Sequence, residues 1–400
     1  MIVKIEKLDN YGRGITYIND KIVFVEDALP DEEIKIKIIK ETKKYIEAQA
    51  VKYIKTSNKR KKSECPYSEK CGGCNLEHIS FQEENNFKVE KVTSLLKKYA
   101  EVEYPIHDIK YHERNYYRNK IILHGKDKKI GLYEKNSNNI VQISKCMLVN
   151  NKINEAIDFI NKNNKCIKEA IIKTSNDNKN LMIKITGNIN NYEQLKETTD
   201  VLIINDKYYT EKRKIITNIG NKQYYQSINS FFQINNTLTE ELYNEILNIV
   251  KEKHPNKVLD LYCGCGTIGI YISDYCDKII GIDYNESNII DATNNKELNK
   301  VNNIEFINSK VEDKIEEFDD IDLIIVDPPR AGLDIKTRKN LKRINAKIII
   351  YVSCDPITLS RDLNELKELY NVSKIKLFNM FPKTYHVESV SVLERKSVEK

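Results

Sequence analysis

The sequence predicts an α/β protein whose C-terminal part is built on a parallel sheet covered by helices on both faces. From residue 257 onward, continuous apolar segments alternate with amphipathic ones, a pattern typical of such sheets. Residues 1–55 instead contain short strand-like runs separated by turn residues, which indicates a small β-barrel of the oligonucleotide-binding type. Between these parts, residues 110–225 alternate strand-like and Asn-rich segments, which predicts a mixed, mostly β region.

The composition excludes two broad classes of protein. The chain has 400 residues, of which 40% are hydrophobic and 31% are charged, so we expect neither a disordered polyelectrolyte nor a membrane protein. Residues 1–7 show no apolar export segment, and we therefore expect a cytoplasmic protein. The nine cysteines then lie in a reducing compartment, where thiols bind metals or do chemistry rather than form a disulfide scaffold.

Positive charge is concentrated near the N-terminus. The formal net charge of the whole chain is +6, whereas residues 35–62 contain eleven Lys or Arg and only two Glu. A polyanion such as RNA would be attracted to this segment. A solvated surface followed by a flexible linker explains the same charge equally well.

The individual elements follow from local patterns. β-Branched residues predict strands at 21–25 and 33–38, and a helical pattern covers about 81–99. The expected strands of the parallel sheet lie at 257–262, 278–283, 304–307, 322–327 and 346–351.

A glycine turn follows the first of these parallel strands. Gly264 and Gly266 belong to a G-x-G-x-x-G pattern, which lets the backbone turn tightly and approach a ligand. Asp283 ends the next strand, where a carboxylate can bind the ribose hydroxyls of a nucleoside. The spacing suits a nicotinamide-dependent dehydrogenase and an S-adenosylmethionine-dependent methyltransferase alike. Asp327 and the two prolines after it favour the methyltransferase, because base-modifying methyltransferases place a comparable corner beside the target base.

A thiol and a carboxylate are the candidate catalytic groups. Cys354 precedes Asp355 and Pro356, a typical helix start, and we expect the helix N-terminus to lower the pKa of this thiol. Cys354 is therefore a candidate nucleophile, with a buried hydrophobic role as the alternative. Glu388 begins an apolar strand and is either a surface end-cap or a general base.

Four further cysteines lie outside the catalytic half. Cys65, Cys71 and Cys74 are close in sequence, and Gly72 and Gly73 let the chain wrap around a bound group; Cys146 is the fourth thiol. Four thiolates suit either structural zinc or an iron–sulfur cluster, and the spacing alone does not choose between them.

Together these residues resemble the RNA uracil-C5 methyltransferase family, in the form that carries an N-terminal TRAM domain and a [4Fe-4S] cluster. Residues 23–32 look like the TRAM strand and turn, residues 229–235 match a cofactor-binding segment, and Ser-Cys-Asp-Pro surrounds the cysteine that matches the nucleophile. The departures are mild: Tyr262 stands where Phe is common, Asp283 where Glu is common, and Thr267 where Asn is frequent.

The resemblance implies a three-part organisation. Residues 1–57 would form an OB-like TRAM domain that binds RNA, and residues 58–225 an iron–sulfur and central domain whose helix near 81–99 packs on the catalytic domain. Residues 226–400 would form a Rossmann-like methyltransferase domain.

It also implies roles for individual residues. Cys354 would be the nucleophile and Glu388 the base. The implied cofactor residues are Gln233, Tyr262, Asp283, Asp327, Gly264 and Gly266, and the implied cluster ligands are Cys65, Cys71, Cys74 and Cys146.

The expected function is methyl transfer from S-adenosylmethionine to C5 of a uridine in 23S ribosomal RNA by a cytoplasmic monomer. The same chemistry on the T-loop of transfer RNA is the alternative substrate. A nicotinamide-dependent oxidoreductase and a non-catalytic RNA-binding factor are alternatives of other classes. The sequence leaves open which uridine is modified and what the cluster does.

Overall fold

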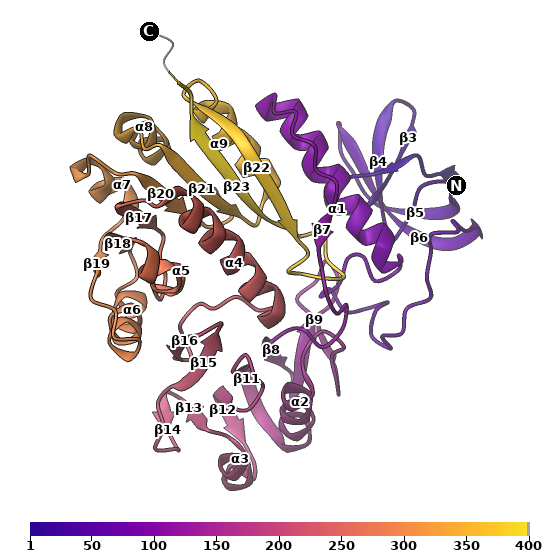
Figure 1. Cartoon of the computed structure of the whole chain (residues 1–400). Coiled ribbons are helices and arrows are strands. Elements are labelled where there is room, and N and C mark those ends of the chain that lie inside the picture. The colour runs from indigo at the N-terminus through magenta and orange to yellow at the C-terminus, as the bar shows by residue number, and fades with distance from the viewer. Residues whose placement is uncertain (398–400) are drawn as a thin grey trace.

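The computed structural model describes residues 1–397 and confirms the α/β class, with four sheets in the described chain (Figure 1). The N-terminal sheet has the strand order β1-β5-β6-β4-β3-β2. Alternate residues such as Val23, Val25, Ile34 and Ile36 point inward and form its core. The six strands are β1 (Ile2–Lys4), β2 (Lys7–Leu8), β3 (Gly14–Ile18), β4 (Lys21–Glu26), β5 (Glu33–Glu41) and β6 (Tyr45–Lys55).

The helix predicted near residues 81–99 joins the N-terminal barrel to the C-terminal half. It forms α1 (Phe81–Leu95) and continues as a π-helical segment (Leu96–Ala100). Ser80 caps it, because its hydroxyl accepts a hydrogen bond from the Glu83 amide. In Figure 1, α1 lies between the N-terminal strands and the last strands of the chain. It packs against α9 (Pro356–Leu366), and the short strand β7 (Ile109–Lys110) then pairs with the C-terminal sheet.

The central sheet has the order β10-β9-β8-β11-β12-β13-β14 and confirms a mixed, mostly β region. Its strands are β8 (Lys120–Lys126), β9 (Lys129–Tyr133), β10 (Ile140–Gln142), β11 (Asn164–Thr174), β12 (Leu181–Ile189), β13 (Val201–Ile204) and β14 (Lys207–Tyr208). Two of the Asn-rich connections form helices, α2 (Asn151–Asn163) and α3 (Tyr192–Thr198). In α2, Ile153, Ile157 and Ile160 recur at helical spacing and are buried, while polar residues occupy much of the other face.

A hairpin of β15 (Ile215–Ile219) and β16 (Lys222–Gln226) leads into the C-terminal half and contacts its helices. The predicted domain boundary at residue 225 falls inside β16. The boundaries at residues 57 and 225 stay predictions.

The C-terminal sheet has the order β19-β18-β17-β20-β21-β23-β22-β7. Its first five strands are parallel, and β23 is antiparallel to both of its neighbours. Successive residues of β20 belong to different core clusters, Ile325 on one face and Ile324 on the other, so the sheet is buried on both sides. The strands are β17 (Lys257–Leu261), β18 (Lys278–Asp283), β19 (Ile304–Asn308), β20 (Leu323–Val326), β21 (Ile348–Ser353), β22 (Tyr370–Phe378) and β23 (Glu388–Arg395).

Helices cover both faces of this sheet (Figure 1). In addition to α9, they are α4 (Asn236–Lys253), α5 (Thr267–Ile272), α6 (Glu286–Leu298), α7 (Val311–Lys314) and α8 (Ile335–Ile344), with short 3-10 turns at Ser273–Tyr275 and Ile315–Glu317. None of the helices in residues 1–397 combines the length and the apolar character that crossing a membrane requires.

A fully buried ion pair ties α1 to the loop between β22 and β23. The Nζ atom of Lys88 donates to Oε1 of Glu84 at 2.9 Å and to Oδ1 of Asn379 at 2.6 Å. The same Glu84 oxygen accepts from the Lys383 amide at 2.9 Å. Both charged side chains are fully buried. Because each charge has several partners, the pair holds residues 379–383 against α1.

We expect Lys88→Met to destabilise the protein by about 3 kcal/mol, because it leaves the buried Glu84 carboxylate without its main counter-charge. Urea denaturation measures the change. Lys162→Met is the matched control, since Lys162 pairs with Asp158 at the same i,i+4 spacing on an exposed helix face and should cost less than about 0.5 kcal/mol. Equal effects of the two substitutions would contradict the role of the buried pair.

Candidate active site

Cys354 and Glu388 lie at adjacent ends of the neighbouring strands β21 and β23. Cys354 directly follows β21, and Glu388 is the first residue of β23. The antiparallel register pairs Ser353 with Ser389, so Cys354 and Glu388 each lie one residue beyond this pair. The Ser389 hydroxyl also donates to the Ser353 carbonyl at 3.3 Å, which holds the two strands in this register. Glu388 is buried, whereas Cys354 is partly exposed.

The backbone beside Cys354 forms the predicted helix start. Asp355 is the N-cap of α9, and its Oδ1 atom accepts hydrogen bonds from the Ile357 and Thr358 amides. Pro356 occupies the first helical position, where its missing N–H has no intrahelical partner to lose. The local sequence therefore predicts this geometry correctly.

The expected lowering of the Cys354 pKa is wrong. Burial, reinforced by the nearby carboxyl groups of Glu388 and Asp327, raises the pKa of the thiol to about 12 against the opposing effect of Arg330. Burial also raises the pKa of Glu388 well above its ordinary value, again with Asp327 adding to the effect. A helix N-terminus acts in the opposite direction but is the weaker influence in this surrounding.

Three carboxyl groups surround the glycine turn at the carboxyl ends of β17, β18 and β20. Burial raises the pKa of Asp327 to about 7. Burial and the neighbouring Asp327 raise the pKa of Asp260 to about 8, although the Gly269 amide donates to Asp260 at 3.1 Å. Asp283 accepts from the Gly264 amide at 3.1 Å. This concentration of carboxyl groups suits a cationic ligand.

Asp260 is a further candidate site residue, in addition to those that the sequence predicts. Its Oδ1 atom is buried without a hydrogen-bond partner in the described chain, beside the glycine turn. A charged residue in the middle of the apolar strand β17 was the available signal.

Gly264 and Gly266 are required in the turn for different structural reasons. Gly264 has a φ of +53°, and a Cβ atom there would meet nothing within 4 Å, so open space lies in front of the turn. At Gly266, with a φ of +73°, a Cβ atom would meet the Phe306 ring at 2.5 Å. The open space at Gly264 and the unpartnered oxygen of Asp260 fit a bound S-adenosylmethionine, whereas Gly266 is required by packing.

The remaining predicted cofactor residues are Gln233 and Tyr262. Gln233 is in the loop between β16 and α4, and its carbonyl accepts from the Asn119 side chain at 3.0 Å. Tyr262 directly follows β17 in a left-handed conformation with a φ of 62°. β17 and β20 are neighbours although they are not consecutive in sequence, and ligands of open α/β sheets bind where the strand order reverses in this way.

Arg330 and His386 complete the polar surroundings of the pair. The Arg330 guanidinium lies 3.3 Å from Nε2 of His386. Burial, together with the positive charge of Arg330, lowers the pKa of His386 to about 3, so the imidazole is neutral and can accept from Arg330. Arg330 is the nearby cation that favours the ionised forms of both Cys354 and Glu388.

The four cysteines of the N-terminal half share one cavity of about 270 Å³. They come from the loop before α1 and from the segment after β10; the lining thiols are Cys65, Cys71, Cys74 and Cys146. Lys383 also lines this cavity and forms an ion pair with Glu77 at 2.9 Å. The cavity is thus adjacent to the loop that leads to Glu388.

A family model described as tRNA (uracil-5-)-methyltransferase matches residues 173–396, and a TRAM domain model matches residues 1–51. Two bacterial proteins named as uncharacterized RNA methyltransferases, from Clostridium tetani and Aquifex aeolicus, are each 32% identical to this chain. The alignments cover 96% and 98% of this chain and 93% and 98% of theirs.

A solved structure resembles this chain over nearly its whole length. It is the tRNA (uracil-54, C5)-methyltransferase of Pyrococcus abyssi in complex with S-adenosyl-L-homocysteine, with a TM-score of 0.81 and 26% identity. The match covers 98% of this chain and 100% of that one. The S-adenosyl-L-homocysteine bound in that structure is S-adenosylmethionine without its methyl group. S-adenosylmethionine is the cofactor that fits the carboxyl-rich turn of this chain.

The raised thiol pKa predicts slow alkylation of Cys354. Iodoacetamide reacts with the thiolate, and a thiol with a pKa of about 12 is protonated below that pH. In the substrate-free protein, the rate at Cys354 should therefore rise about tenfold per pH unit between pH 8 and 10 without a plateau. Peptide mass spectrometry follows each cysteine.

The exposed Cys166 is the internal reference, and it should react faster than Cys354 at pH 8. In urea, where the thiol returns to a pKa of about 8.5, the rate at Cys354 should level off near pH 9. A plateau below pH 9 in the folded protein would show that the thiol is activated before substrate binds.

Proposed function

The chain belongs to the tRNA (uracil-5-)-methyltransferase family, and we propose that it transfers a methyl group from S-adenosylmethionine to C5 of a specific uridine in 23S ribosomal RNA. Family membership makes it an S-adenosylmethionine-dependent RNA uracil methyltransferase rather than a nicotinamide-dependent oxidoreductase. The observation that supports the proposed mechanism is the position of Cys354 and Glu388, each one residue beyond the Ser353–Ser389 pair of β21 and β23, where the Glu388 carboxyl acts on the thiol.

The proposed reaction begins at Cys354. Uracil C5 is a poor nucleophile, so the thiolate first adds to C6, and the electron pair of the C5–C6 double bond moves toward O4 as an enolate. C5 then takes the methyl group of the sulfonium as the sulfur–methyl bond breaks, and neutral S-adenosylhomocysteine is left. Glu388 removes the proton from C5, the double bond re-forms, and the C6–sulfur bond breaks to release the Cys354 thiolate.

The charge distribution of the site sets two requirements on this reaction. The Cys354 thiol must lose its proton after substrate arrives, because its pKa is about 12 in the free protein. Arg330 is placed to favour that ionisation, since it opposes the effect of the carboxyl groups. Glu388 must also be ionised when it accepts the C5 proton, and Arg330 favours this state as well. The uridine must be flipped out of its stack, because C6 is attacked from the face of the base.

A uridine of transfer RNA is the second candidate substrate. It is favoured by the full-length similarity to the Pyrococcus abyssi enzyme, whose name specifies uracil 54 of tRNA. The barrel would contact either RNA mainly through its phosphates, using the lysine-rich strands β5 and β6. We place the enzyme in the cytoplasm and propose that it acts as a monomer.

We further propose that Cys65, Cys71, Cys74 and Cys146 bind a [4Fe-4S] cluster. Their thiols line one cavity, and thiolate sulfur is the ligand that such clusters prefer. Across residues 1–397, no three His, Cys, Asp or Glu side chains converge closely enough to hold a single metal ion.

The nucleophile and base are tested by trapping. RNA containing 5-fluorouridine should form a covalent complex with the wild type, because fluorine at C5 leaves no proton for Glu388 to remove. Cys354→Ala should form none, and Cys166→Ala should behave as wild type. With normal uridine, Glu388→Gln should accumulate the adduct, measured as a shifted band in denaturing gels. Trapping by Cys354→Ala, or rapid turnover by Glu388→Gln, would remove the respective role.

The RNA target is tested by mapping 5-methyluridine with mass spectrometry in ribosomal and transfer RNA, with and without the gene. The proposed function predicts loss at a position of 23S RNA. Loss at a transfer RNA position would instead establish the second candidate.

The cluster is tested by the colour of protein purified without oxygen. We expect brown protein with broad visible absorbance, and loss of that absorbance in Cys71→Ser but not in Cys166→Ser. Colourless wild-type protein containing zinc would contradict the proposed cluster while leaving the methylation tests unaffected.

A further inference from the structure

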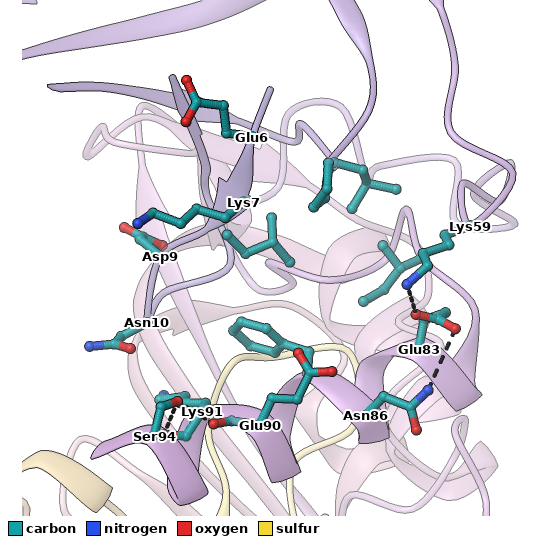
Figure 2. A pocket seen from close by; sticks show the side chains of 15 residues that line it. Glu6, Lys7, Asp9, Asn10, Lys59, Glu83, Asn86, Glu90, Lys91 and Ser94 are labelled. Atoms are coloured by element: carbon teal, nitrogen blue, oxygen red, sulfur yellow. Dashed lines mark hydrogen bonds and ion pairs between the residues drawn. The ribbon is translucent and has the colours of Figure 1, made fainter. Parts of the chain in front are cut away.

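A cleft of about 270 Å³ lies between the N-terminal barrel and helix α1, outside the catalytic pair and the cysteine cavity (Figure 2). Lys7 and Asn10 border it from the barrel, and Asn86, Glu90 and Lys91 border it from the helix. Both walls therefore come from elements that precede the catalytic half in sequence.

The two sides of the cleft make different contacts. On one side, the Lys59–Glu83 ion pair, at 2.7 Å, joins the linker to the first turn of α1. Figure 2 shows this pair on the opposite side of the cleft from Lys91. At the Lys91 end, Nζ donates to the Tyr385 carbonyl at 3.1 Å, three residues before Glu388. The Tyr385 ring in turn lies against the Tyr11 ring of the barrel, with the ring centroids 5.2 Å apart.

The lining combines an apolar floor with a polar rim. Leu8 and Phe87 line the cleft and pack on the buried Leu29 and Ile79. These four side chains form the apolar floor of the cleft. The amide of Asn86 and the carboxylate of Glu90 belong to exposed residues on the rim. An unpaired nucleobase needs such a surface, because its face packs on apolar or aromatic groups while its edge forms hydrogen bonds.

The rim offers carboxylates that can accept hydrogen bonds. Glu6, Asp9, Glu83 and Glu90 border the cleft together with Lys7, Lys59 and Lys91. Glu83 is paired with Lys59 and Asp9 with Arg13, whereas Glu6 and Glu90 lie outside the ion pairs of residues 1–397. Carboxylates accept hydrogen bonds from the exocyclic amino groups of bases, as Glu and Asp do with cytosine N4. Guanine, adenine and cytosine carry such a group and uracil does not.

We propose that this cleft binds an unpaired nucleotide of the substrate RNA, close to the methylated uridine, whose base carries an exocyclic amino group. The inference rests on the proposed function and adds a second base-recognition site to it. Binding there brings RNA against Lys91 and Tyr385, and so against the loop that ends at Glu388. The site selects its RNA by a nucleotide that is not itself methylated.

The experiment combines variants of the cleft with changes in the RNA. Abasic substitutions are placed one at a time at each of the nucleotides that flank the target uridine in a short stem-loop substrate. Methylation kinetics and RNA binding by fluorescence anisotropy are measured for the wild type, Glu90→Gln and Asn86→Ala. Glu103→Gln is the control, because Glu103 is exposed and pairs with Lys97 away from the cleft.

We expect each cleft variant to raise KM and Kd for RNA by about fivefold, as for a lost hydrogen bond, with kcat at saturating RNA unchanged. One abasic position should weaken binding to the wild type by a similar factor and should have no further effect in Glu90→Gln. A base without an amino group at that position should behave like the abasic site.

Two results would contradict the proposed binding site. One is a wild-type KM for RNA in both cleft variants. The other is that the fold-changes in Kd from the variant and from the abasic substitution multiply at every RNA position, which would mean that they act independently. A wild type that binds the RNA but does not methylate it would contradict the proposed function instead. Control kinetics equal to wild type exclude a general effect of removing a negative charge.

Discussion

The buried Glu84–Lys88 pair is the interaction on which the arrangement of the active site depends. Its partners are side-chain and backbone groups of residues 379–383, so it holds the loop between β22 and β23 against helix α1. That loop ends at Glu388. The strand register then places Glu388 and Cys354 at adjacent strand ends. The proposed base is therefore positioned from two sides, by the sheet and by a helix that lies before the catalytic half in sequence.

The thiol illustrates how the relative size of two effects decides a pKa. A helix N-terminus stabilises a nearby negative charge by about 0.3–1 kcal/mol, and by up to about 2 kcal/mol when partly buried. Burial can shift a pKa by about 3–5 units, and each unit corresponds to about 1.4 kcal/mol. In this site the thiol is buried, and the carboxyl groups of Glu388 and Asp327 also lie close to it. Both effects raise the pKa of Cys354. Activation of the proposed nucleophile would therefore depend on Arg330, which opposes this rise, and on the arrival of substrate.

Features that arise from neighbouring residues could be predicted from the sequence, and those that join distant segments could not. The parallel strands, the glycine turn and the helix start at Asp355 each have a local pattern, and all are present. Lys88 and Asn379 are 291 positions apart, and no local pattern marks them as partners. The antiparallel insertion of β23 between β21 and β22 likewise depends on tertiary packing. Helix α2 was missed because its many Asn residues have low helix propensity, although its buried isoleucines carried the helical period.

The loop at residues 379–387 connects regions that otherwise have little in common. Lys383 lines the cysteine cavity, and its carbonyl accepts from the amides of Asn75 and Leu76, one and two residues beyond Cys74. Tyr385 contacts both Lys91 in the barrel–helix cleft and Tyr11 in the barrel. His386 lies beside Arg330, next to the proposed nucleophile. Because Lys383, Tyr385 and His386 belong to one short segment, RNA at the barrel and the proposed cluster would both lie against the segment that leads to Glu388. In the proposed function, the N-terminal half would therefore help to position the proposed base in addition to holding RNA.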